Sequence, residues 1–182
     1  MIDLNATEKY FIAPHVKKGG LAVDFTMGNG HDTLWLSRAV GEEGQVIAFD
    51  IQEQALQSTR ALLEKEGREN CTLILDSHAN VGQYVTRPIC AGLFNLGWLP
   101  GGDKTVTTRR ESTLAAIRAA IGLLEEGGGL LIAVYPGHAE GTAEGEAVER
   151  LLSGYDRHGI CCSKFRIVNS PTSPFFFLVE KG

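Results

Sequence analysis

The sequence has no apolar run long enough to cross a bilayer, and its N-terminus lacks the basic and then apolar layout of a signal peptide. These absences favour a cytoplasmic location. Cysteine is scarce and forms no C-x-x-C pair, so a structural zinc site is not expected. The cysteines are expected to be buried, reduced thiols: Cys71, Cys90, Cys161 and Cys162.

Basic residues are also few. Lysine and arginine number 17 against 22 aspartates and glutamates, and the net charge of −5 argues against broad, non-specific nucleic-acid binding. One local concentration of positive charge lies on a loop and the helix expected after it. It is either a solvated helix start or an RNA contact, and it consists of Lys104, Arg109, Arg110 and Arg118.

Apolar and amphipathic segments alternate along the 182 residues, which we expect to form a single domain, residues 1–182. Continuous apolar strands between amphipathic helices predict an α/β fold, with a mostly parallel sheet covered by helices on both faces. Two apolar runs around a turn rich in serine and proline predict a closing antiparallel hairpin. The expected strands are residues 21–24, 45–50, 71–76, 89–95 and 130–135, followed by the hairpin runs 161–168 and 175–180.

Local signals predict several helix boundaries. Asn5, with Glu8 three residues later, is expected to cap the first helix. Thr108 and Glu111 have the spacing of a capping box and predict the start of a long helix. We expect that helix to stop at the glycines 127–129, and we expect further helices from His31 and near residues 52–66 and 140–152.

A glycine loop after the first strand predicts a cofactor that contains adenosine. Residues 24–30 are DFTMGNG, and a helical pattern opens at His31, so backbone N–H groups and a helix N-terminus are available to a ligand. Thr33 occupies the place of the third glycine of a dinucleotide fingerprint. Asp24 leads the loop, and an acid there suits the positive ammonium and sulfonium groups of S-adenosylmethionine better than a pyrophosphate. S-adenosylmethionine is therefore preferred over a nicotinamide or flavin cofactor.

The carboxyl ends of the parallel strands define the expected ligand edge of the sheet. There Asp50 is placed to bind ribose hydroxyls with Gln52 beside it, and Ser77 and His78 fall where the adenine is expected. Asp32 either contacts the methionine part of the cofactor or only caps its helix. The predicted cofactor-binding residues are Asp24, Met27, Gly28, Asn29, Gly30, Asp32, Asp50, Gln52, Ser77, His78 and Asn95.

The end of the fourth strand predicts the acceptor side. A methyl transfer is an in-line displacement, so an amine acceptor must aim a lone pair at the sulfonium methyl group. The Asn95 oxygen and the Leu96 carbonyl can hold the amine hydrogens, and Trp98 either stacks a flat ring or simply packs. The predicted substrate-binding residues are Trp98, Lys104, Arg109 and Arg110.

Three segments together resemble one family. They are DFTMGNGHDT at residues 24–33, FNLGWLPGGDK at residues 94–104, and YPGH at residues 135–138 with Gly141 and Glu144. The chain resembles the class I S-adenosylmethionine-dependent methyltransferases of the "putative rRNA methylase" family. MnmM-type members of this family methylate the 5-aminomethyl group of the tRNA wobble (2-thio)uridine. The resemblance extends over nearly the whole chain.

The resemblance implies a Rossmann-like, seven-stranded methyltransferase sheet, S-adenosylmethionine as methyl donor, tRNA (through its anticodon region) as acceptor, and no metal. It implies cofactor contacts from Asn29, Asp32, Asp50, Gln52, Ser77 and His78, and an acceptor side with the catalytic residues Asn95, Tyr135 and His138. An alkylammonium acceptor must lose a proton, and His138 is the expected titratable group. A structural His138 that bonds a loop carbonyl explains the residue equally well.

Other functions stay open on the sequence. Within the methyltransferases, rRNA or a small amine can be the acceptor. A nicotinamide-dependent oxidoreductase would need a third glycine and a catalytic site that these residues do not assemble. A non-catalytic RNA- or nucleoside-binding module would keep the fold without transferring a methyl group. The oligomeric state is open too, with a homodimer among the alternatives.

Overall fold

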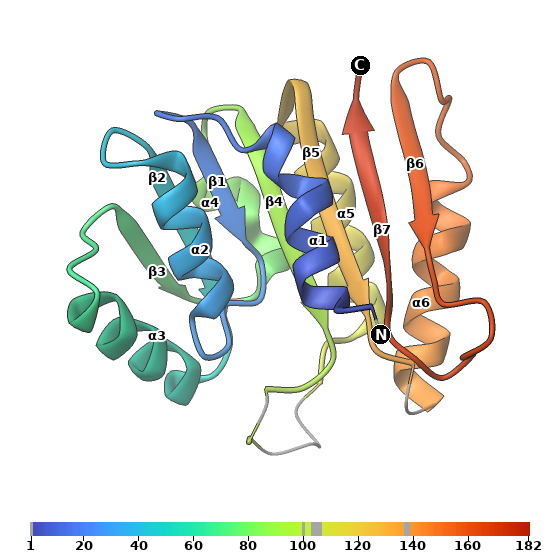
Figure 1. The fold of residues 1–182 in the computed structure, drawn as a ribbon, viewed down its shortest axis with the longest axis horizontal. Coiled ribbons are helices and arrows are strands. Elements are labelled where there is room, and N and C mark those ends of the chain that lie inside the picture. Colours follow the sequence, from blue (N-terminus) through green and yellow to red (C-terminus); the bar gives the residue numbers. More distant parts are fainter. Residues whose placement is uncertain (1, 100, 103–106, 137–138) are drawn as a thin grey trace.

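The computed structural model describes residues 2–99, 101–102, 107–136 and 139–182, in which strands and helices alternate (Figure 1). The strands are β1 (Leu21–Asp24), β2 (Gln45–Asp50), β3 (Cys71–Leu75), β4 (Ile89–Leu96), β5 (Leu124–Val134), β6 (Ile160–Phe165) and β7 (Phe175–Lys181). The helices are α1 (Leu4–Ile12), α2 (His31–Val40), α3 (Glu53–Lys65), α4 (Val81–Tyr84), α5 (Arg110–Leu123) and α6 (Ala139–Leu152), with short 3-10 turns η1 (Ala13–His15) and η2 (His78–Asn80).

The seven strands form one sheet in the order β3-β2-β1-β4-β5-β7-β6. The first five strands in this order pair in parallel, whereas β7 runs antiparallel to both β5 and β6. The predicted fold class, a mostly parallel Rossmann-like sheet with a C-terminal antiparallel hairpin, is confirmed. Because the parallel strands share one direction, their carboxyl ends meet at one edge, the lower edge in Figure 1.

Successive side chains along each strand point to opposite faces of the sheet and pack into two hydrophobic cores, one on each face. Val23 and Phe94 pack with Ile117 of α5 in one core. Ala22 packs with Leu36 of α2 in the other. Figure 1 shows α1 and α2 in front of the sheet and α5 behind it. With both faces covered, the central strands are apolar at almost every position, as the sequence pattern predicts.

The predicted cap of the first helix is wrong. Asp3 caps α1, because its carboxylate accepts the backbone N–H of Ala6 at 3.1 Å. Asn5 therefore lies inside the first turn, and the helix starts at Leu4. The helix therefore begins two residues earlier than predicted, and Asn5 of its first turn lies at the carboxyl edge of the parallel strands.

Both predicted ends of the long helix are also wrong. The N-cap of α5 is Arg109. The hydroxyl of Thr108 accepts the N–H of Gly97 at 3.0 Å, in place of a helix N–H, and donates to Glu144 on α6 at 2.7 Å. The helix ends at Leu123, and the glycines 127–129 lie within β5, where Gly129 pairs with β7. At the start of the helix, tertiary hydrogen bonds replace the expected cap. At its end, pairing within the sheet extends the chain as a strand through the glycines.

The cysteines are all free, but the expectation that they are buried holds only for Cys90. Cys71 and Cys162 are half-buried and Cys161 is exposed, because β3 and β6 are the two edge strands. β6 also ends at Phe165 rather than at Val168. Among the described residues, no helix is long and apolar enough to span a membrane, and no group of three His, Cys, Asp or Glu side chains could hold a metal ion.

Candidate active site

Two adjoining cavities of about 380 Å³ each lie at the carboxyl edge of the parallel strands. This is the size range of small-molecule sites. The β3-side cavity reaches the ends of β2 and β3, with Asp50 and His78 in its wall. The α1-side cavity reaches α1 and the end of β5, with Asn5 and Tyr135 in its wall. They share the lining residues Thr26, Gly28, Asn95, Gly97 and Trp98, so together they form one elongated site.

Asp50 is fixed at the end of β2 by backbone donors. Its two carboxylate oxygens accept the N–H of Gly28 at 3.1 Å and the N–H of Gln52 at 3.0 Å. Burial raises the pKa of Asp50, although these hydrogen bonds oppose the shift. Each carboxylate oxygen keeps capacity for another donor, so the pair of hydroxyls of a ribose fits this group. Gln52 lines the same cavity.

His78 presents a buried acceptor to the β3-side cavity. Its Nδ1 lies 3.1 Å from the carbonyl oxygen of Phe25, so Nδ1 carries the proton and donates it. Burial lowers the pKa of His78 and keeps the ring neutral. In the described part of the chain Nε2 is buried without a hydrogen-bond partner. A ligand N–H group, such as the amino group of adenine, would satisfy it, and Ser77 lines the cavity beside it.

Asp24 lies beneath the glycine loop and lines neither cavity. It is fully buried and accepts the N–H of Thr26 at 3.1 Å and the hydroxyl of Thr33 at 2.7 Å. Burial and the nearby charge of Asp32 raise the pKa of Asp24. The structure therefore does not bring Asp24 to a ligand. Asp24 links the loop to α2. Thr33, at the place of the third glycine, supplies the hydroxyl that donates to Asp24.

The loop itself packs closely on α3. Gly28 and Gly30 have φ values of +50° and +84°, which glycine adopts readily. A Cβ at Gly30 would lie 2.9 Å from the Cα of Thr59, whose hydroxyl donates to the carbonyl of Gly28 at 3.1 Å. Met27 and Asn29 line the α1-side cavity, whereas Gly30 lines neither cavity.

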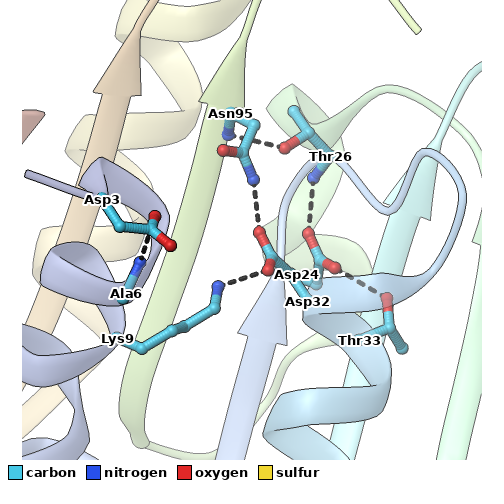
Figure 2. Close-up of polar contacts among 8 residues, drawn as sticks. All are labelled: Asp3, Ala6, Lys9, Asp24, Thr26, Asp32, Thr33 and Asn95. Atoms are coloured by element: carbon cyan, nitrogen blue, oxygen red, sulfur yellow. Dashed lines mark hydrogen bonds and ion pairs between the residues drawn. The ribbon is translucent and has the colours of Figure 1, made fainter. Parts of the chain in front are cut away.

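Asn95, Asp32 and Lys9 form a chain of polar contacts that joins β4, α2 and α1 (Figure 2). The Asn95 backbone N–H donates to the Thr26 hydroxyl at 2.7 Å, and its side-chain Nδ2 donates to Asp32 at 2.6 Å. The other Asp32 oxygen pairs with the ammonium of Lys9. A carboxylate can only accept, so the Asn95 NH₂ group must face Asp32 and its oxygen is left as an acceptor. Asp32 does not cap α2, whose N-cap is Gly30.

The first turn of α1 and the end of β5 form the outer wall of the α1-side cavity. Asn5, His31 and Tyr135 line it. Partial burial, aided by the charges of Glu8 and Asp32, raises the pKa of Tyr135 to about 12, although 41% of the residue is exposed. Its hydroxyl is therefore a proton donor at neutral pH rather than a base. Sequence reasoning missed Asn5, because its residue type matched a helix cap.

Lys9, which pairs with Asp32, and the buried Glu8 beside it were also missed, although neither lines a cavity. Only 5% of Glu8 is exposed, and desolvation raises its pKa to about 7 despite the neighbouring Lys9 charge. The signal that could have found both residues is their position: the helix that precedes β1 must pack beside the loop that follows it.

A buried carboxylate supports the loop that carries Trp98. Glu144 of α6 accepts the hydroxyls of Thr108 at 2.7 Å and Thr113 at 2.6 Å. Thr108 in turn accepts the N–H of Gly97 at 3.0 Å, which fixes the backbone beside Trp98. Glu144 thereby links α6 and α5 to the shared wall of the two cavities.

The predicted substrate residues are only partly brought together. Trp98 lines both cavities and Arg109 lines the β3-side cavity. Arg110 lines neither and pairs with Glu140 at 3.3 Å. The predictions for Lys104 and His138 fall outside the residues that the structure describes.

Comparison with known proteins decides the family. The family model described as "Putative rRNA methylase" matches residues 46–181. The chain belongs to this family. A model of the ubiE/COQ5 methyltransferase family also matches residues 7–83. The predicted family is thus confirmed.

A curated relative and two solved structures agree with this family. The chloroplastic tRNA (mnm(5)s(2)U34)-methyltransferase of Arabidopsis thaliana is 36% identical over 177 residues, 91% of this chain and 65% of the relative. The chain therefore spans about two-thirds of that relative's length.

The crystal structure of a putative rRNA-methylase from Clostridium thermocellum has a TM-score of 0.95 to this chain and 36% identity, and each chain is covered completely. A putative methyltransferase from Streptococcus mutans, solved in complex with SAH, has a TM-score of 0.90 and 39% identity, again over 100% of both chains. These two neighbours share the Rossmann-like architecture, and the SAH complex supports S-adenosylmethionine as the cofactor.

Proposed function

We propose that the chain is an S-adenosylmethionine-dependent methyltransferase that acts on RNA, and that its acceptor is the 5-aminomethyl group of the tRNA wobble (2-thio)uridine. The observation that carries the proposal is the Asn95 amide, which is oriented by Asp32 so that its oxygen can accept a hydrogen bond at the junction of the two cavities. Membership of a methylase family and the 36% identity to a tRNA wobble methyltransferase support it.

The β3-side cavity fits the adenosine part of the cofactor. Asp50 can accept both ribose hydroxyls, Gln52 and Ser77 lie beside it, and the buried His78 Nε2 lacks the donor that adenine offers. A Cβ at Gly28 would lie 3.4 Å from a side-chain carbon of Leu99, so glycine at this position keeps the cavity wall open. When bound, S-adenosylmethionine supplies a methyl group activated by the positive sulfonium.

The α1-side cavity fits the acceptor. The Asn95 oxygen accepts a hydrogen from a neutral amine and so directs its lone pair along the line of displacement. Trp98 offers a face on which a uracil ring can stack. Tyr135 donates a hydrogen bond, because its raised pKa keeps it protonated. His138 is the proposed acceptor of the ammonium proton, and Lys104, Arg109 and Arg110 are the proposed phosphate contacts.

Nucleoside mass spectrometry of undermodified tRNA, before and after incubation with protein and cofactor, tests the proposal. We expect a gain of one methyl group on 5-aminomethyl uridine. Methylation of rRNA alone, or of a small amine alone, would overturn the tRNA assignment. Calorimetric binding of NAD without binding of S-adenosylhomocysteine would overturn the methyltransferase assignment itself.

Two variants test the assigned residues. Asn95→Ala and His138→Ala should each lower turnover while the affinity for S-adenosylhomocysteine stays close to wild type. Arg60→Ala, on the exposed side of α3, is a control that should change neither. Wild-type turnover in either active-site variant would remove that residue from the mechanism.

A further inference from the structure

A basic groove lies between α5 and α6 and adjoins the β3-side cavity. Leu114 on α5 and Ala147 and Leu151 on α6 are its apolar lining residues. Its positive charges are four arginines, three from the start and middle of α5 and one from the last turn of α6: Arg109, Arg110, Arg118 and Arg150. We call this surface the α5–α6 groove.

The groove is continuous with the candidate active site. Thr107 and Arg109 line both the α5–α6 groove and the β3-side cavity. The groove therefore begins where that cavity ends and leads away from it along the two helices. A long ligand with one residue in the active site can extend into the groove without a break.

The charge of the groove contrasts with that of the whole chain. The chain has a net charge of −5, yet the groove has four arginines and only two glutamates, Glu111 and Glu140. Arg110 is paired with Glu140 at 3.3 Å. In the described ranges, Arg109, Arg118 and Arg150 have no acidic partner, unlike Arg38, which pairs with Glu66. Three guanidinium groups thus stay available to an anion.

The spacing of the arginines favours an extended polyanion over a single small one. Arg110 and Arg118 are eight residues apart on α5, a separation of about 12 Å along the helix axis. Arg150 faces the groove from the other helix. Guanidinium groups bind phosphate in a bidentate manner, and groups spread over this length match successive phosphates of a strand better than one ion.

We propose that the α5–α6 groove binds the phosphodiester backbone of the RNA substrate, with Arg118 and Arg150 contacting phosphates beyond the modified nucleotide. This inference rests on the proposed function, because it requires an RNA acceptor. It adds Arg118 and Arg150, which line neither cavity, to the residues that bind the substrate. The alternative is that the groove binds an acidic protein segment, and the test below distinguishes this from RNA binding.

The test compares two double variants with equal loss of charge. Arg118→Gln with Arg150→Gln removes two groove arginines, and Arg60→Gln with Arg157→Gln removes two exposed arginines elsewhere. Dissociation constants for undermodified tRNA are measured between 50 and 200 mM salt, together with KM and kcat. The affinity for S-adenosylhomocysteine and the thermal unfolding of each variant check that it is folded.

We expect the groove variant to raise KM and Kd for tRNA about tenfold or more, with kcat at saturating tRNA and S-adenosylhomocysteine affinity unchanged. Each lost phosphate contact should reduce the slope of log K against log salt by about 0.7–0.9. The control variant should keep the wild-type slope. An equal loss in both variants would overturn the inference, because it would reflect net charge alone.

Failure of the inference and failure of the proposed function give different results. If wild-type protein methylates tRNA and the groove variant binds it as tightly as wild type, the groove assignment is wrong and the function stands. If wild-type protein neither binds nor methylates any RNA but methylates a small amine, the proposed function fails and the groove assignment fails with it. The RNA assignment would also be overturned if an acidic peptide bound to wild-type protein but not to the groove variant, while RNA bound to neither.

Discussion

Asn95 donates its side-chain N–H to Asp32 at 2.6 Å, and this one hydrogen bond determines that the amide oxygen is the end left as an acceptor (Figure 2). Lys9 holds the second oxygen of Asp32 and neutralises its charge. The three residues come from β4, α2 and α1, so no local sequence pattern links them. Asp32 is placed to position Asn95, which is a different role from the capping and cofactor-binding roles that the sequence leaves open.

Asp32→Asn should therefore lower turnover. An asparagine at this position can donate as well as accept, so it no longer forces the Asn95 oxygen toward the acceptor. We expect kcat to fall about tenfold or more, equivalent to about 1.4 kcal/mol, with a small change in S-adenosylhomocysteine affinity. Asp50→Asn is the contrast, since it should weaken cofactor binding. A large loss of cofactor affinity in Asp32→Asn with unchanged kcat would contradict the positioning role.

Gly30→Ala should destabilise the protein more than Gly19→Ala. Both glycines have positive φ, +84° and +76°, so both substitutions share a strain of about 1–2 kcal/mol. Only at Gly30 does the new Cβ meet backbone, 2.9 Å from the Cα of Thr59, whereas nothing lies within 4 Å at Gly19. Urea denaturation should show the difference, and cofactor binding should be weakened in Gly30→Ala alone. Equal losses would show that the loop can move away from α3.

Glu8 should make stability decrease with rising pH. Burial raises its pKa from 4.5 to about 7, so between these values the folded state holds a proton that the unfolded state has released. The free energy of unfolding therefore falls as the pH rises through this window, by an amount on the order of 3 kcal/mol for this group. Burial of Asp24 acts in the same direction.

Glu8→Gln removes this titration. Relative to wild type, the variant should gain stability between pH 5 and pH 8, measured by chemical denaturation at each pH. Glu53→Gln, on an exposed position of α3, is the matched control and should leave the wild-type profile in place. A parallel pair of profiles for wild type and Glu8→Gln would show that Glu8 does not titrate in this range.

Thr113→Val should cost about 1–3 kcal/mol of folding free energy. The substitution keeps the shape of the side chain but removes the hydroxyl that donates to buried Glu144 at 2.6 Å, so a buried acceptor oxygen loses a donor. Thr113→Ser keeps the hydroxyl and should recover most of the stability. Equal denaturation midpoints for the valine and serine variants would assign the loss to packing.

Many of the residues predicted to bind the cofactor line the two cavities, because their positions follow from local sequence. A strand, its turn and the next helix lie within residues 21–40, and parallel strands bring Asp50, Ser77 and His78 to the same edge. The helix boundaries were less predictable. Thr108 satisfied a capping-box pattern, but its hydroxyl accepts the N–H of Gly97 and donates to Glu144, which lies 36 residues away on α6. A capping pattern read from neighbouring residues cannot include a hydrogen-bond partner that is distant in sequence.

The sequence by itself determined the alternation of strands and helices, the family, and the loop that favours S-adenosylmethionine, since each depends on residues near one another in the chain. Only the tertiary structure decided that Asp24 lies beneath the loop, that Lys9 and Asp32 orient Asn95, and that the arginines of α5 and α6 share one groove. Burial and hydrogen-bond direction depend on packing between elements that are distant in sequence. Periodicity and motif spacing do not record that packing.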